Sequence, residues 1–301
     1  MKKPSIFIPL TLVLFLAALS LGQACSTQGP VRPGPKGSLL IIGGGERTGD
    51  IMKRFTTLAA GFDAGKIVVF TMATGVPDEV RQDTLAEYEK LGIKDVAVYH
   101  LTREEALKPD AAKILDGAGG VFFTGGDQSK LTAVLLGTPV LARVREIYEK
   151  GGIIGGTSAG AAVQSELMIT GDEKRTKNED ELWQAILADN VVHTEGFGFV
   201  EDAIIDQHFV TRRRHNRLIS VVLENPSLVG VGIEESTAVL VRPDGKYEVV
   251  GENQVIIYDA RRAKTAKSPT GRLGGHGLAM HVLLPGDVYD LAAGRLEEPS
   301  K

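Results

Sequence analysis

The chain has 301 residues, of which 43% are hydrophobic and 24% charged, and its formal net charge at pH 7 is −4. This is the composition of an ordinary globular protein, and the slight acidic balance provides no basic surface for nucleic acid. Only 6% of the residues are aromatic, so a platform on which bases stack is not expected either.

The first 24 residues have the pattern of a secretory signal peptide. A short basic start, MKK, precedes the apolar run IFIPLTLVLFLAALSL and the small residues that lie three and one positions before Cys25. The apolar run is short for a membrane span, which favours cleavage over an uncleaved anchor. Residues 25–37 are polar and rich in Pro and Gly, so we expect a flexible linker. The sequence therefore predicts an exported protein.

Cys25 is the only cysteine, so no disulfide can form within the chain. A single cysteine at a cleavage boundary is similar to the lipid-attachment cysteine of bacterial lipoproteins, although Gly22 stands where those proteins usually have leucine. Two outcomes stay open. The mature protein is either anchored by a lipid at the cell envelope or released to the periplasm or the medium.

From residue 38 the chain alternates short apolar runs that end in glycine with amphipathic stretches. The runs are rich in β-branched residues and several are apolar on both faces, as buried strands of a parallel sheet are. The stretches at 77–92 and 138–151 read as helices that end at a glycine. The expected strands are 38–45, 66–75, 95–101, 119–127 and 151–158.

This alternation predicts an α/β fold, an open, doubly wound and mostly parallel sheet flanked by helices. After about residue 225 the pattern changes to antiparallel strands with Asp244-Gly245 as a hairpin turn, which are expected to extend the sheet or to form a small second layer. Residues 38–290 are expected to form one domain and residues 291–301 a loose tail. Ligands of such sheets bind beyond the carboxyl ends of the strands.

The segment GTSAG at 156–160 matches the G-x-S-x-G pattern of a nucleophile elbow between a central strand and a helix. A buried strand precedes it and an alanine-rich stretch follows, which is the context that displays the serine above a sheet. Ser158 is then a nucleophile, with the backbone N–H of Ala159 directed at a developing oxyanion. The alternative is a helix cap in which Ser158 only binds backbone N–H groups. The motif alone does not decide between them.

Neither a cofactor nor a metal is expected. The glycine-rich segment GGGERTG at 43–49 matches neither the dinucleotide-binding pattern nor the P-loop, so it reads as a tight turn near the pocket. No pair of histidines has ligand spacing on a helix, and a single cysteine forms no cluster.

His208 is the histidine best placed to be the base that a serine nucleophile needs. It follows the apolar residues 203–205, where a short strand is expected to end. A packed polar residue at a helix start is the alternative. Arginines follow at 212–214 and 217, and they fit either a solvated cationic surface or a clamp for carboxylates. Their place beside a candidate base, in a slightly acidic chain, favours the clamp.

A third group should orient the histidine. Glu234 and Glu235 end an apolar run in GVGIEESTAVLV, and one of the two should point inward because neighbours on a strand alternate. Asp172 and Glu173, which follow the helix after the elbow, are rival candidates.

Four motifs in chain order resemble the cyanophycinases of serine peptidase family S51: FFTGGDQSKL, GTSAGA, DQHF with its trailing arginines, and GIEESTA. The resemblance covers about residues 38–260, and four ordered motifs are far more specific than one elbow. Aspartyl dipeptidases of the same family share the elbow but have a shorter chain and lack the full DQHF-arginine stretch. The resemblance implies an exopeptidase that degrades cyanophycin, with an Asp-specific dipeptidase as the alternative within the family.

Cyanophycinases cut a polymer with an aspartate backbone and an arginine on each β-carboxyl to β-Asp-Arg dipeptides. By motif match, the resemblance implies Ser158 as nucleophile, His208 as general base and Glu235 as orienting acid. The N–H groups of Ala159 and Gly126 are the expected oxyanion donors. Arginines suit the carboxylates of the substrate, and an acid suits its arginine. The residues implied in substrate binding are Gln128, Asp206, Gln207, Arg212, Arg214 and Arg217.

The stretch 171–196 is longer and more charged than the resemblance predicts, so we expect it to form a lid or to alter one edge of the pocket. Together with a signal peptide, the resemblance implies an enzyme that scavenges polymer released by other cells. It also makes a homodimer an expected assembly. A non-catalytic lipoprotein that binds peptides stays open as a different class, and it predicts no covalent adduct of Ser158 with a serine-directed reagent.

Overall fold

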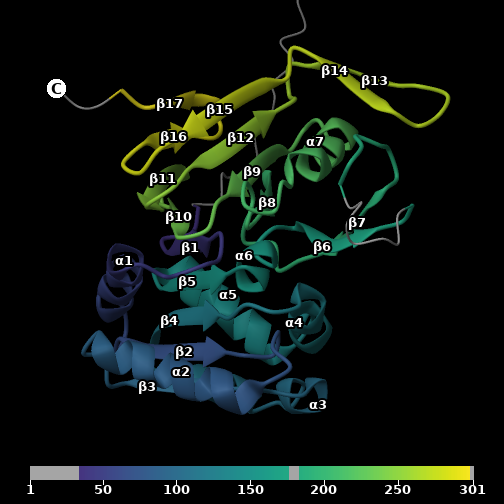
Figure 1. Cartoon of the computed structure of the whole chain (residues 1–301). Helices are drawn as coiled ribbons and strands as arrows, with labels where there is room; N and C mark the ends of the chain where they lie inside the picture. Colours follow the sequence, from purple (N-terminus) through teal and green to yellow (C-terminus); the bar gives the residue numbers. More distant parts are fainter. Residues whose placement is uncertain (1–33, 176–182, 299–301) are drawn as a thin grey trace, which may run out of the picture. The chain divides into compact units, whose positions relative to one another are not determined.

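The computed structural model describes residues 34–175 and 183–298 (Figure 1). The expected signal peptide, Cys25 and most of the linker lie outside the described residues, as does the middle of the charged stretch 171–196. Within the described ranges, no helix has both the length and the apolar character needed to cross a membrane.

The largest sheet has nine strands in the order β17-β16-β11-β10-β1-β5-β4-β2-β3. Its five strands from β1 to β3 are parallel to one another, as the apolar runs predict. Four of them are buried almost throughout on both faces, since helices cover the sheet above and below, whereas the edge strand β3 is only partly buried. These strands are β1 (Ser38–Ile42), β5 (Ile153–Thr157), β4 (Ala118–Phe123), β2 (Lys66–Phe70) and β3 (Val96–Tyr99).

Helices cover both faces of this parallel half, which confirms a doubly wound α/β fold. Side chains of β1 alternate between the two faces, because successive residues of a strand point to opposite sides. Leu40 and Ile42 pack with α1 and α2, whereas Leu39 and Ile41 belong to the core that includes α5. The helices of this half are α1 (Gly49–Ala60), α2 (Pro77–Lys90), α3 (Arg103–Ala106), η1 (Ala111–Leu115), α4 (Gln128–Leu135) and α5 (Pro139–Lys150).

Antiparallel strands extend the sheet beyond β1. The hairpin of β10 (Thr237–Val241) and β11 (Lys246–Gly251) turns at the expected Asp244-Gly245, where the N–H of Gly245 donates to the carbonyl of Arg242. The outer strands β16 (Val288–Asp290) and β17 (Arg295–Leu296) complete it. The sheet therefore continues past residue 290, into a segment expected to be a loose tail.

A second sheet has four strands in the order β15-β12-β9-β8, so the late strands both extend the first sheet and form another layer. Helix α7 (His215–Glu224) packs on it through Leu218, Val221 and Val222 (Figure 1). Its strands are β8 (Ala203–Asp206), β9 (Val229–Ile233), β12 (Val255–Asp259) and β15 (Ala279–Leu283). Two further hairpins form separate two-stranded sheets, β6 (Leu167–Glu173) with β7 (Val191–Glu195), and β13 (Lys264–Lys267) with β14 (Leu273–His276).

Residues 234–236 carry the chain from β9 of the second sheet directly into β10 of the first. At the same level, β8 ends at Asp206 and β5 ends at Thr157. The carboxyl ends of β1, β5, β8 and β9 therefore meet at one edge, and the candidate site is built there.

Candidate active site

Ser158 lies on a sharp turn between β5 and α6 (Ala159–Ala162). Its backbone has φ 53° and ψ −109°, and its side chain makes no capping hydrogen bond, so it does not act as a helix cap. The positions on either side, Gly156 and Gly160, have no room for a side chain. A Cβ on Gly156 would lie 2.0 Å from the carbonyl oxygen of Gly160, and one on Gly160 would lie 2.1 Å from that of Phe123. The turn thus has the strained geometry of a nucleophile elbow.

The side chains of Ser158, His208 and Glu235 form a continuous hydrogen-bonded chain. Nε2 of His208 lies 2.8 Å from Oγ of Ser158, and Nδ1 lies 2.5 Å from Oε1 of Glu235. A carboxylate can only accept, so the proton sits on Nδ1 and leaves the lone pair of Nε2 for the serine hydroxyl. This arrangement has the geometry of a serine–histidine–acid triad.

The environment of His208 keeps its imidazole neutral. Burial lowers the pKa of His208 below its ordinary value, and the charge of Arg212 acts in the same direction, while the hydrogen bond that His208 donates to Glu235 opposes them. A neutral imidazole is the form that accepts a proton. The environment therefore favours the protonation state that a general base needs.

The three glycines at 43–45 support the histidine, a role that sequence reasoning missed. The carbonyl of Gly43 accepts the N–H of His208 at 2.7 Å, and the carbonyl of Gly44 accepts that of Ser236 at 2.8 Å. A Cβ on Gly44 would lie 2.2 Å from Cε1 of His208. The triple glycine, read from the sequence as a tight turn, was the available signal, because only glycine lets a chain approach a ring so closely.

The two adjacent acids point to different partners. Glu235 contacts the imidazole of His208, whereas Glu234 accepts hydrogen bonds from the loop that follows the histidine. The rival acids lie in the β6–β7 hairpin, where Asp172 accepts from the hydroxyl of Thr170 and Glu173 from the amide of Asn190. Glu235 is therefore the acid that the structure places on the histidine.

The expected oxyanion donors lie on two turns beside the serine. A Cβ on Gly125 would lie 3.4 Å from Cβ of Ser158, which places the β4–α4 turn against the elbow. Gly126 has φ 134°, and a side chain there would strike the carbonyl of Ala73 at 2.2 Å. Within the described ranges, the N–H groups of Gly126 and Ala159 donate to no other residue. Neither N–H group is used by the fold, as the expected role in binding an oxyanion requires.

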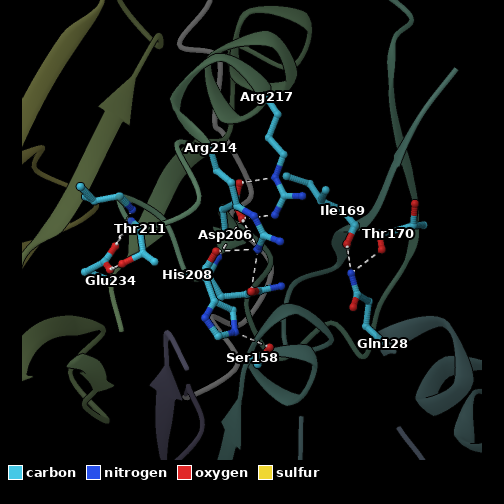
Figure 2. Close-up of polar contacts among 12 residues, drawn as sticks. Gln128, Ser158, Ile169, Thr170, Asp206, His208, Thr211, Arg214, Arg217 and Glu234 are labelled. Carbon is cyan, nitrogen blue, oxygen red and sulfur yellow. Dashed lines mark hydrogen bonds and ion pairs between the residues drawn. The ribbon is translucent and has the colours of Figure 1, made fainter. Parts of the chain in front are cut away.

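Gln128, at the start of α4, is buried and held by β6. Its amide nitrogen donates to the carbonyls of Ile169 at 2.8 Å and Thr170 at 2.5 Å (Figure 2). The nitrogen is thereby occupied, which leaves the carbonyl oxygen as the group that can accept from a ligand.

Asp206 and Arg217 form a buried bidentate ion pair. Nε of Arg217 lies 2.8 Å from Oδ2 of Asp206, and its terminal nitrogen binds Oδ1 (Figure 2). The Asp206 side chain is 0% exposed and that of Arg217 is 2% exposed. The guanidinium also lies 4.8 Å from the ring of Trp183. Both oxygens of the acid are thus committed, although the sequence suggested that it faces a ligand's arginine.

Arg214 and Gln207 extend this network toward the histidine. Arg214 donates to both the carbonyl and the side-chain oxygen of Gln207, each at 2.7 Å. Burial, together with the neighbouring Arg217, lowers the pKa of Arg214 to about 9. Arg212, by contrast, is exposed and lies close enough to affect the charge balance of His208. Four of the predicted binding residues therefore form a largely buried network beside the histidine, whereas Arg212 is an exposed cation. The network consists of Asp206, Gln207, Arg214 and Arg217.

A family model described as Peptidase family S51 matches residues 39–249, well over half of the chain. The chain belongs to peptidase family S51. Its curated relatives include the cyanophycinase of Synechococcus elongatus, which is 34% identical over 86% of this chain and 80% of the relative. The cyanophycinase of Geminocystis herdmanii is 32% identical over 85% of this chain and 94% of the relative.

The fold is also found in a solved structure. The crystal structure of a peptidase from an acI-B1 Actinobacterium matches with a TM-score of 0.64 at 23% identity, and covers 86% of this chain and 98% of that one. At this identity the likeness supports the α/β fold. The family match confirms the resemblance that the four sequence motifs suggested.

Proposed function

We propose that this S51 peptidase is an exported serine exopeptidase that degrades cyanophycin to β-Asp-Arg dipeptides. The observation that carries the proposal is the hydrogen-bonded chain of Ser158, His208 and Glu235 in a family whose curated relatives are cyanophycinases. The exposed guanidinium of Arg212 and the free carbonyl oxygen of Gln128 suit a substrate that carries both carboxylates and arginines.

In the proposed reaction, Oγ of Ser158 attacks the scissile carbonyl while Nε2 of His208 takes the hydroxyl proton. The N–H groups of Ala159 and Gly126 donate to the oxyanion that forms. The imidazolium, stabilised by Glu235, then gives its proton to the leaving amine, and an acyl ester remains on the serine. A water molecule, deprotonated by the same imidazole, hydrolyses that ester and restores the enzyme.

Incubation of the purified mature protein with cyanophycin tests this function, with the products identified by mass. We expect β-Asp-Arg from the wild type and none from Ser158→Ala at unchanged fold. An Asp-specific dipeptidase would hydrolyse aspartyl dipeptides and leave the polymer intact. A non-catalytic peptide-binding protein would leave Ser158 unmodified by a fluorophosphonate.

Export is the second part of the proposal, and the N-terminal pattern of residues 1–25 supports it. Cell fractionation of the wild type and of Cys25→Ser separates the two outcomes. Release of the variant from the membrane fraction would support lipid anchoring, whereas an unchanged distribution in the medium or periplasm would support simple secretion. A protein retained in the cytoplasm in both forms would contradict export.

A further inference from the structure

The turn that follows His208 is held by the carboxylate of Glu234. The N–H of Thr211 donates to Oε2 at 3.0 Å, the N–H of Val210 donates to the same oxygen, and the hydroxyl of Thr211 donates to Oε1 (Figure 2). Glu234 is 5% exposed, so this acid lies inside the protein and reaches outward to the turn.

These hydrogen bonds hold two exposed residues of the turn, Val210 and Thr211, against an acid that lies inside the protein. The turn itself is strained at both ends, because His208 has φ 48° and Arg213 has φ 55°, in the region that side chains disfavour. Such a conformation persists only where neighbouring groups hold it.

The Glu234 carboxylate is ionised while it accepts these hydrogen bonds. Burial would raise the pKa of Glu234, but the hydrogen bonds from the Thr211 hydroxyl and from the N–H groups of Thr211 and Val210 outweigh burial and lower that pKa. An ionised carboxylate makes stronger hydrogen bonds than a neutral acceptor. The contact is thus maintained throughout the pH range in which the histidine works.

The next residue along the chain, Glu235, binds the ring of the same histidine. Two consecutive acids thus hold the imidazole and the turn behind it, and the connection between β9 and β10 that carries them is itself held by hydrogen bonds. The N–H of Glu234 donates to the carbonyl of Gln254 at 3.2 Å, and Nδ2 of Asn253 donates to the carbonyl of Glu235 at 2.9 Å.

We propose that Glu234 is a positioning residue, which fixes the backbone of His208 and the placement of the exposed Arg212, the residue that follows its contacts. Its effect on substrate binding rests on the proposed function, whereas its effect on the reactivity of Ser158 does not. The N–H of Arg212 donates to the carbonyl of His208 at 3.0 Å, so both side chains belong to the turn that Glu234 holds.

The test compares Glu234→Ala and Glu234→Gln with Glu248→Ala, a matched control. Glu248 is a strand glutamate whose carboxylate binds Arg54, away from the triad. The first readout is the rate at which a fluorophosphonate labels Ser158, which needs His208 but no cyanophycin. The second is kcat and KM on cyanophycin, and the third is the melting temperature.

We expect Glu234→Ala to label and to turn over about 30- to 100-fold more slowly, because a misplacement of the base of about 1 Å has an effect of that size. Its KM should rise, since Arg212 moves as well. Glu234→Gln keeps an oxygen for the N–H groups and an amide for the Thr211 hydroxyl, so it should recover to within about fivefold. Glu248→Ala should label as the wild type does.

Labelling of Glu234→Ala at the wild-type rate would overturn the proposal. So would a loss of rate that the fraction of unfolded protein accounts for fully, because the acid would then be merely structural. A Glu234→Gln variant as slow as Glu234→Ala would also overturn it. If the wild type is labelled but leaves cyanophycin intact, the proposed function fails while the labelling series still decides on Glu234. A wild type that resists labelling overturns both.

Discussion

Replacement of Gly44 by alanine tests how closely the glycine turn supports His208, the proposed general base. A Cβ atom at this position would lie 2.2 Å from Cε1 and 2.5 Å from Nε2 of His208. Carbon atoms in contact are about 3.5 Å apart, so the ring has to retreat by about 1.3 Å or the turn has to open. The backbone φ of 110° at Gly44 adds strain, because residues with a side chain rarely adopt it.

This displacement of the ring would disrupt the hydrogen bond between Nε2 of His208 and Oγ of Ser158, which is 2.8 Å long. A displacement of about 1 Å at a reacting group lowers the rate by about 100-fold, which corresponds to about 2.7 kcal/mol in the activation barrier. We therefore expect kcat on cyanophycin to fall about 100-fold in Gly44→Ala, with a smaller change in KM.

The assay measures kcat, KM and the rate of fluorophosphonate labelling of Ser158 for the wild type, Gly44→Ala and Gly75→Ala. Gly75 is the matched control, because a Cβ there meets no atom within 4 Å. Its activity should stay within about twofold of the wild type, as for other surface changes. If Gly44→Ala labels at the wild-type rate, the ring has tolerated the methyl group and the steric argument is refuted.

Three further predictions concern the acids and the base. Glu235→Gln should lower kcat by about 10⁴-fold, since the correct tautomer of His208 loses its partner; a fall of less than tenfold would contradict this. The acid limb of the pH profile of kcat/KM should lie below the ordinary histidine pKa of about 6.5, because burial lowers the pKa of His208 and the neutral form is the active one. In Glu235→Gln the limb should move to still lower pH, because Glu235 raises that pKa. A limb above 7 in the wild type would contradict the lowered pKa of His208. In urea denaturation, Asp206→Asn or Arg217→Met should each reduce the free energy of unfolding by about 3–5 kcal/mol, and the double variant should lose less than the sum; strict additivity would show that the pair is not coupled.

The parallel half of the fold is predictable because its signals are local. Apolar runs, helical periodicity and terminal glycines each act within one segment, and they place β1 to β5 and the helices α2 and α5 at the observed positions. The nucleophile elbow can be predicted from the sequence for the same reason, since the space around Gly156 and Gly160 is determined by the strand and helix that flank the elbow in sequence.

The site itself depends on contacts between distant segments, which one sequence does not reveal. The alternation of Glu234 and Glu235 predicts that they face apart, but it does not say which of them meets His208. The partner of Asp206 was missed because Arg217 reaches it from α7, eleven residues later, across a turn with two strained residues. The second sheet was foreseen only as one of two options, since strand patterns carry no information on which edge they join.

Trp183 is the only tryptophan of the chain, and its ring lies 4.8 Å from the guanidinium of Arg217. Any tryptophan emission from this protein therefore originates at one known place, next to the buried Asp206–Arg217 pair and within the charged stretch 171–196. Trp183 therefore serves as an intrinsic fluorescent probe. A shift or quenching of its emission reports, without any added label, a change in the surroundings of the Asp206–Arg217 pair.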